Sequence, residues 1–233
     1  MKWFYDLLDD FLSLLFPRVC YGCGNHLLRN EYLICTECFV EIPRTGYHDL
    51  MDNPLEKVFW GRCRIDSAAA FSFYNRGSRI RNLIHNLKYK GIKELGPELG
   101  RIYGSTLISS DFIKDIDLIL PVPLHPSKRR ARGFNQSELI AEGLSQATGI
   151  RYDKSILLRK SASATQTKRT RYERWLNVEG IFSVDKPEEL AGRHVLIIDD
   201  VITTGSTMES CVNEVLKAEG VKVSVAALAF APA

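Results

Sequence analysis

Apolar residues recur along this chain with two different spacings. Short apolar runs are typical of strands buried on both faces of a parallel sheet. These runs cover residues 68–74, 116–122, 195–198 and 221–230. Other stretches repeat apolar residues every three or four positions, which indicates helices with one buried face. These stretches cover residues 79–89, 94–108, 137–147 and 208–219. Because strands and helices alternate from residue 68 onward, the pattern predicts an α/β domain in which helices cover both faces of a parallel sheet.

Three shorter segments precede the predicted domain, which we place at residues 67–233. Residues 1–17 repeat apolar side chains on one helical face and are expected to form an amphipathic helix that packs on the protein itself. A membrane-surface helix is the alternative, but its polar face is acidic and anionic lipid would repel it. Residues 18–45 contain four cysteines. Residues 46–66 hold prolines and glycines without apolar periodicity, which predicts a linker.

No stretch of the chain is long and apolar enough to span a bilayer. The apolar start of the chain also lacks the small-residue cleavage site of a signal peptide and, beyond Lys2, its basic beginning. We therefore expect a cytoplasmic protein without stable membrane insertion.

Four cysteines form two C-x2-C pairs that are separated by eleven residues. They are Cys20, Cys23, Cys35 and Cys38. Four thiolates hold zinc tetrahedrally, and each pair can bind through a tight turn. Two disulfides are the alternative, which a cytosolic chain disfavours. Because the protein would fill all four ligand positions, the spacing predicts a structural zinc module rather than a catalytic metal site.

The net charge of +3 is unevenly distributed. Residues 128–174 carry twelve Lys and Arg against four Asp and Glu, a local +8, so the rest of the chain sums to −5. This basic segment begins directly after the strand predicted at 116–122, where a loop could bind phosphate groups. The loop contains Lys128, Arg129, Arg130, Arg132 and Gly133. A nucleic-acid or localisation patch is the alternative interpretation of the same charges.

Residues 195–207 combine an apolar strand, two adjacent carboxylates and a turn rich in hydroxyl groups. Asp199 and Asp200 repel each other and contribute nothing to a core. We therefore expect both to be exposed after the end of the strand, where ligands of open α/β sheets bind, so that replacing both with Asn leaves the fold intact. The turn that follows consists of Thr203, Thr204, Gly205, Ser206 and Thr207.

The turn lies at the start of a predicted helix, where free N–H groups bind phosphate. An ordinary N-capped helix would explain the hydroxyl groups but not the two carboxylates. A receiver domain is excluded because only 33 residues follow Asp200, and no Walker A pattern occurs. Carboxylates beside a phosphate site favour a ligand with both hydroxyl groups and a phosphate, such as a ribose 5-phosphate.

Residues 195–207 resemble the phosphoribosyl pyrophosphate (PRPP) motif of type I phosphoribosyltransferases. Upstream, the strings PVPLH at 121–125 and RGFNQ at 132–136 are similar to those of the ComF family. The members of this family are competence-associated proteins related to amidophosphoribosyltransferases. On these motifs the whole chain is identified as a member of the ComF family, with a type I phosphoribosyltransferase fold behind its zinc module.

The resemblance implies a role for each motif. Asp199 and Asp200 would hold the ribose hydroxyls, directly or through Mg²⁺, and residues 203–207 would surround the 5-phosphate. Residues 128–133 would form the pyrophosphate loop, and residues 159–177 a flexible catalytic loop. The flexible loop would contribute Gln166, Lys168, Arg169 and Arg171. Transfer would displace pyrophosphate from the anomeric carbon of the ribose, to an acceptor and with a base that the sequence does not identify.

The resemblance also implies a role in DNA uptake during competence, with single-stranded DNA and a competence helicase as partners. Tyr21, Tyr32 and Phe39 of the zinc module could stack on the bases of a single strand. A DNA-binding accessory protein with a non-catalytic PRPP site is therefore the alternative to an active enzyme. Glutamine hydrolysis is not expected, because the first cysteine, Cys20, belongs to the zinc pair.

Overall fold

Four parallel strands form the central sheet, in the order β1-β6-β5-β2. Their bounds are β1 Ala68–Phe73, β2 Leu118–Pro121, β5 His194–Ile202 and β6 Lys222–Phe230. The structure is a computed structural model that describes residues 17–160 and 180–232. The amphipathic helix predicted at 1–17 lies outside these residues, except for its last residue, Pro17. The predicted parallel α/β architecture is confirmed.

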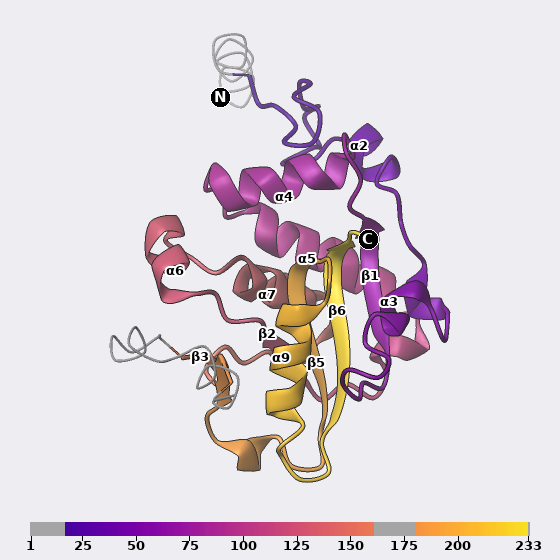
Figure 1. Cartoon of the computed structure of the whole chain (residues 1–233). Coiled ribbons are helices and arrows are strands. Elements are labelled where there is room, and N and C mark those ends of the chain that lie inside the picture. The colour runs from indigo at the N-terminus through magenta and orange to yellow at the C-terminus, as the bar shows by residue number, and fades with distance from the viewer. Residues whose placement is uncertain (1–16, 161–179, 233) are drawn as a thin grey trace.

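Helices cover both faces of the sheet (Figure 1). One face packs against α4 Arg79–Tyr89, α5 Leu95–Leu107 and α7 Gln136–Thr148. The other face packs against α9 Ser206–Val215 and the short helix α3 Pro54–Lys57. Successive residues of β5 alternate between the two cores: Leu196 and Ile198 face α5 and α7, while Val195 and Ile197 face α9. This alternation explains why residues 195–198 of the strand are apolar without interruption.

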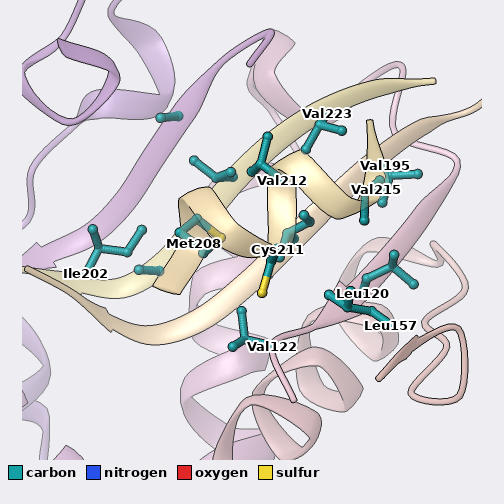
Figure 2. Packing of buried hydrophobic residues seen from close by; sticks show 14 of the residues in the cluster. Leu120, Val122, Leu157, Val195, Ile202, Met208, Cys211, Val212, Val215 and Val223 are labelled. Carbon is teal, nitrogen blue, oxygen red and sulfur yellow. The ribbon is translucent and has the colours of Figure 1, made fainter. Parts of the chain in front are cut away.

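Apolar side chains recur at helical spacing on one face of α9 and contribute to a core that also contains the rings of Phe59, Phe182 and Phe230. Figure 2 shows Met208, Cys211, Val212 and Val215 on the side of α9 that faces the strands. Each of these four side chains is at most 2% exposed. The helix predicted at 208–219 therefore has the predicted buried face, although it begins two residues earlier and ends at Val215.

Close packing of α5 against α7 depends on glycine. A Cβ at Gly100 would lie 2.2 Å from the carbonyl oxygen of Ile140, and a Cβ at Gly143 would lie 2.0 Å from that of Pro97. Any larger residue at either position would push the two helix backbones apart.

The segment predicted to be a linker, residues 46–66, packs on the sheet. It contains the 3₁₀ turn η1 Tyr47–Asp49 and α3. Its Leu55 and Phe59 are fully buried in the core beneath α9. The Asn53 side chain caps α3 and donates a hydrogen bond to the carbonyl of Ala68 at 2.8 Å, which ties the segment to β1.

The remaining elements are short. An antiparallel pair, β3 Leu157–Arg159 and β4 Phe182–Val184, lies beside the main sheet. The others are α2 Thr36–Val40, η2 Asp111–Ile113, α6 Pro126–Arg132 and η4 Pro187–Glu189. None of the helices within residues 17–160 and 180–232 combines the length and the apolar character that a membrane span requires.

Candidate ligand site and metal centre

The acidic pair lies inside β5, not after its end. On one side β5 pairs with β2 only as far as Ile198, opposite Pro121. On the other side it continues to pair with β6 as far as Ile202. The prediction that the strand stops at residue 198 is therefore wrong, because β6 alone supports four more residues of β5. The missing length of β2 leaves one edge of β5 open beside the carboxylates, at the carboxyl ends of the parallel strands.

Asp199 is held by the start of α7. Its Oδ1 accepts hydrogen bonds from the Ser137 hydroxyl and from the backbone N–H of Asp200, both at 2.8 Å. Burial raises the pKa of Asp199, and the negative charge of Asp200 raises it further, to about 7. The hydrogen bonds and the ammonium group of Lys88 oppose this rise. Asp199 can therefore change its charge near neutral pH, where a ligand or a cation would favour the ionised form.

Asp200 is buried, at 3% exposure, and forms an ion pair with Lys88 across a distance of 2.7 Å. The expectation that both carboxylates are exposed and free of structural partners is wrong. Asp199 is partly buried and accepts a hydrogen bond from Ser137, and the last turn of α4 passes over Asp200 and supplies Lys88. The second carboxylate oxygen of Asp200 is buried without a hydrogen-bond partner among the described residues. A buried acceptor of this kind is costly unless a ligand or water satisfies it.

The hydroxyl-rich turn forms a small cavity with Asp199. The cavity has a volume of about 60 Å³ and lies at the start of α9. Its lining consists of Asp199 and residues 201–208. Gly205 adopts φ +77°, which is unfavourable for other residues, and a Cβ at this position would lie 2.8 Å from Val58. The turn therefore presents backbone N–H and hydroxyl groups at a helix start, an arrangement that suits a phosphate.

Arg62 holds this turn in place through hydrogen bonds, and the sequence did not indicate this role. Its guanidinium donates to the carbonyl of Thr204 at 2.6 Å and to the hydroxyl of Ser206 at 3.4 Å. It also forms an ion pair with Glu209 of α9. Because Arg62 lies in the segment predicted to be a linker, only the three-dimensional fold brings it to residues more than 140 positions away.

The predicted pyrophosphate loop is largely a helix. Residues 126–132 form α6. The side chain of His125 caps its start by accepting a hydrogen bond from the backbone N–H of Ser127, and the helix ends at Gly133, which has φ +81°. The prediction of a loop is wrong because Pro126 begins the helix, Gly133 ends it, and no helix breaker lies between them. The basic side chains of α6 are therefore spread around a helix rather than gathered in a turn, and none of them lines the cavity formed by Asp199 and residues 201–208.

The basic residues of this helix differ in their partners. Arg129 lies 3.5 Å from Glu138, and Arg132 donates to the side chain of Gln136. Lys128 and Arg130 form no ion pair with any described residue. The four residues assigned to the flexible loop lie outside the residues that the structure describes. They are Gln166, Lys168, Arg169 and Arg171.

Two further residues of this region position the site. The Asn135 side chain accepts from the N–H of Ser137 and donates to the carbonyl of Val122 at 3.0 Å. It therefore joins the end of β2 to the start of α7, where Ser137 holds Asp199. The sequence pointed to Asn135 only as part of the string RGFNQ, and Ser137 and Lys88 were missed because nothing local distinguishes them.

The four predicted metal ligands come together near the start of the described chain. The sulfur atoms of Cys20, Cys23, Cys35 and Cys38 all lie within 4.8 Å of one another. The sulfur atoms of Cys23 and Cys35 are 3.7 Å apart, too far for a disulfide. The four cysteines are free thiols, and three of them are buried.

The surroundings of the sulfur atoms fit a structural zinc ion. Cys20 Sγ accepts hydrogen bonds from the backbone N–H groups of Gly22 and Cys35, at 3.3 and 3.2 Å. Burial raises the pKa of the Cys20 thiol, but the backbone N–H donors outweigh this effect and lower it to about 7. Four thiolates that fill a tetrahedral set leave no open position, so the cluster could hold a metal such as zinc in a structural role.

The four-cysteine cluster rests on α4. The side chain of Asn82 donates to the carbonyl of Gly22 at 2.8 Å, and that of Asn86 donates to the carbonyl of Tyr21 at 2.7 Å. These two bonds hold the first C-x2-C turn against the same helix that supplies Lys88 to Asp200.

Known proteins match most of the chain, and a family model matches its second half. The model of the phosphoribosyl transferase domain matches residues 135–233. The DNA utilization protein YhgH of Escherichia coli O6:H1 is 33% identical over 211 residues, which cover 89% of this chain and 88% of that protein. The competence protein ComFC of Bacillus subtilis is 29% identical over 203 residues, which cover 84% and 78%. The competence protein F of Haemophilus influenzae is 34% identical over 107 residues, 46% of each chain. The chain therefore belongs to the ComF family of competence-associated, phosphoribosyltransferase-like proteins.

Proposed function

We propose that the protein binds PRPP, or another phosphorylated ribose, beside the acidic pair of β5 and acts in the handling of DNA during uptake. The observation that carries the proposal is that Asp199 and the residues 203–207 line one cavity. The matching phosphoribosyl transferase domain supports the ligand class. The relatives named for DNA utilization and competence support the biological role, in which single-stranded DNA and a competence helicase would be the partners.

Different residues would bind different parts of the ligand. The turn 203–207 and the start of α9 would bind the 5-phosphate through N–H and hydroxyl donors. Asp199 and the unpartnered oxygen of Asp200 would accept hydrogen bonds from the ribose hydroxyls. The cationic side chains of α6 would face the pyrophosphate. When bound, Mg²⁺ would neutralise charge on the pyrophosphate, which would be the leaving group in transfer to an acceptor.

We also propose that the four-cysteine cluster holds zinc and that the protein works in the cytoplasm. The zinc proposal is supported by the closed set of four sulfur atoms. The catalytic activity itself would require an acceptor that attacks the anomeric carbon, and PRPP binding is the step that can be tested without knowing this acceptor.

The test is calorimetric titration of PRPP in the presence and absence of Mg²⁺. Asp199→Asn keeps the shape of the side chain but removes its charge, so we expect affinity to fall at least about tenfold, since a lost charged hydrogen bond is worth about 1.5–3 kcal/mol. Thr204→Val should also weaken binding, because it removes a donor from the phosphate cavity.

Asp111→Asn is the matched control, because the side chain of Asp111 is 90% exposed and is not part of the cavity. Unchanged affinity in Asp199→Asn would remove the ribose role of the carboxylate. Absence of PRPP binding by the wild-type protein would reject the proposed ligand. In a competent host that carries this protein, Asp199→Asn should lower the yield of transformants.

A further inference from the structure

A basic groove lies between the end of α4 and α6, next to the acidic pair but separate from the phosphate cavity. In Figure 1, α6 lies below the end of α4 that is farther from β1. The groove has a volume of about 540 Å³. Its lining consists of Lys88, Tyr89, Lys90 and Gly91 from the end of α4, and of Lys128, Ala131 and Arg132 from α6. We call it the α4–α6 groove.

The groove is strongly cationic. Four of its seven lining residues are Lys or Arg, and none of these described residues is acidic. Lys88 forms its ion pair with Asp200, but Lys90 and Lys128 form none with any described residue. Unpaired cations that converge on a concave surface attract anionic groups, because the walls of the groove concentrate their field.

The groove also exposes an aromatic ring. The Tyr89 side chain is 71% exposed, although a tyrosine ring favours burial. Its ring centroid lies 4.9 Å from that of His85 and 5.8 Å from the guanidinium carbon of Arg132, which reaches toward it from α6. Tyr89 therefore offers a planar apolar surface between cationic side chains of two helices.

A ligand that satisfies both features must carry a planar ring and an anionic group. We infer that the α4–α6 groove binds nucleotides, with the base stacked on Tyr89 and the phosphate against Lys90, Lys128 and Arg132. Stacking on an exposed aromatic ring beside a basic groove is the usual way in which proteins hold unpaired nucleotides. The inference rests in part on the proposed function, because Lys128 and Arg132 are also among the α6 cations proposed to face the pyrophosphate, whereas PRPP carries no base that could stack on Tyr89.

The nucleotide can be free or part of a single strand, and the two sources require separate probes. Binding of dTMP is measured by calorimetry, and binding of a fluorescent oligothymidylate of about 15 nucleotides by anisotropy, in the wild-type full chain. Tyr89→Ala should lower affinity at least about fivefold, which corresponds to the loss of one stacked base. Tyr89→Phe should keep the affinity, because the ring remains.

Lys90→Met should weaken binding and reduce the salt dependence of oligothymidylate binding by about 0.7 in the logarithmic slope, the value for one lost phosphate contact on a single strand. Trp60→Ala is the matched control for Tyr89→Ala. Trp60 is 57% exposed and lies 5.7 Å from the ammonium group of Lys57, but it is not part of the groove.

The outcomes separate this inference from PRPP binding. Loss of dTMP affinity in Tyr89→Ala with unchanged PRPP affinity supports a site for free nucleotides, and loss for the oligothymidylate alone supports a site for a strand. The inference is overturned if neither probe binds, if Tyr89→Ala binds both as the wild type does, or if Trp60→Ala is as defective. An equal loss of PRPP affinity in Tyr89→Ala would also overturn it, because the groove would then belong to the PRPP site.

Discussion

The four-cysteine cluster and the acidic pair are built in opposite ways. All four sulfur atoms of the cluster come from a stretch of 19 residues, from Cys20 to Cys38, so that two local turns suffice to bring them together. The partners of the acidic pair lie far apart in the sequence, because Lys88 and Ser137 are more than 60 residues from Asp199. A local motif therefore reveals all four members of the cysteine cluster, whereas it reveals only part of a ligand site that the tertiary fold assembles.

The largest effect on stability is expected in the four-cysteine cluster, whose members lie close together in the sequence. Cys35→Ser should lose the bound metal and unfold the residues around the cluster, because metal binding supplies about 10–16 kcal/mol of folding free energy to small zinc modules. Metal analysis and hydrogen exchange of residues 18–40 measure the two losses. Cys63→Ser is the control, because Cys63 lies outside the cluster and should keep about one zinc per chain. A wild-type protein that is purified under reducing conditions without metal would contradict the prediction.

The next effect concerns the ion pair that joins α4 to β5. Lys88→Met leaves the buried carboxylate of Asp200 without its partner, so the free energy of unfolding should fall by about 3 kcal/mol. Urea denaturation measures this change. Adding Asp200→Leu to Lys88→Met should recover most of the loss, since an apolar pair of similar volume carries no unpaired charge. A single variant as stable as the wild type would show that Asp200 is hydrated in solution.

A smaller effect is expected in the phosphate turn. Gly205→Ala places a Cβ at φ +77° and 2.8 Å from Val58, so it should destabilise the protein by about 2 kcal/mol and weaken PRPP binding. Gly149→Ala separates the two causes, because Gly149 has φ +76° but no atom within 4 Å of the added Cβ. Thermal unfolding of both variants should show the larger loss of stability for Gly205→Ala. Equal losses of stability would show that the contact with Val58 contributes no measurable strain.

The smallest effect is the pH dependence of ligand affinity, which reports on Asp199 because burial and the charge of Asp200 raise its pKa to about 7. The folded protein then binds a proton that the unfolded chain releases near pH 4, so this group lowers stability as pH rises from about 4 to 7. Ligand affinity should change in the opposite direction. The ionised fraction rises about tenfold between pH 6 and pH 8, and PRPP·Mg²⁺ affinity should rise with it by up to about 1.4 kcal/mol.

Asp199→Asn is the reference for this pH series, because PRPP itself also takes up protons. Calorimetric titrations of both proteins across the same pH range give the part that belongs to the carboxylate. Parallel curves for the two proteins would show that Asp199 does not titrate in this range.

The sequence predicted correctly those elements whose apolar pattern marks both of their ends. The helix at Arg79–Tyr89 and the strand at Ala68–Phe73 were placed to within one residue. The end of β5 was misplaced because Asp199 and Asp200 look like the end of an apolar run, and only the register with β6 shows that pairing continues to Phe230. A single strand carries no signal of how far its neighbours extend.

The candidate site was predicted in the same uneven way. The carboxylates and the turn 203–207 are contiguous in the chain, so their association was visible. Lys88 lies at the end of a helix, and it becomes part of the site only through its contact with β5. Arg62 lies between short elements, and it becomes part of the site only through its contact with the turn 203–207. Exposure was also misjudged, because nothing in the sequence shows that α4 covers Asp200.

The position of α4 links two sites that the sequence presents as separate. Asn82 and Asn86 of this helix hold the four-cysteine cluster, and Lys88, two residues after Asn86, holds Asp200. If zinc binding favours the observed placement of α4, thermodynamic linkage requires that zinc raise the affinity for PRPP and that PRPP raise the affinity for zinc by the same factor. A chelator series in which PRPP affinity stays constant as zinc is removed would show that the helix is fixed by the core alone. If PRPP affinity instead falls as zinc is removed, the cysteine module acts as an effector site, through which the supply of metal in the cell sets the occupancy of the sugar-phosphate site.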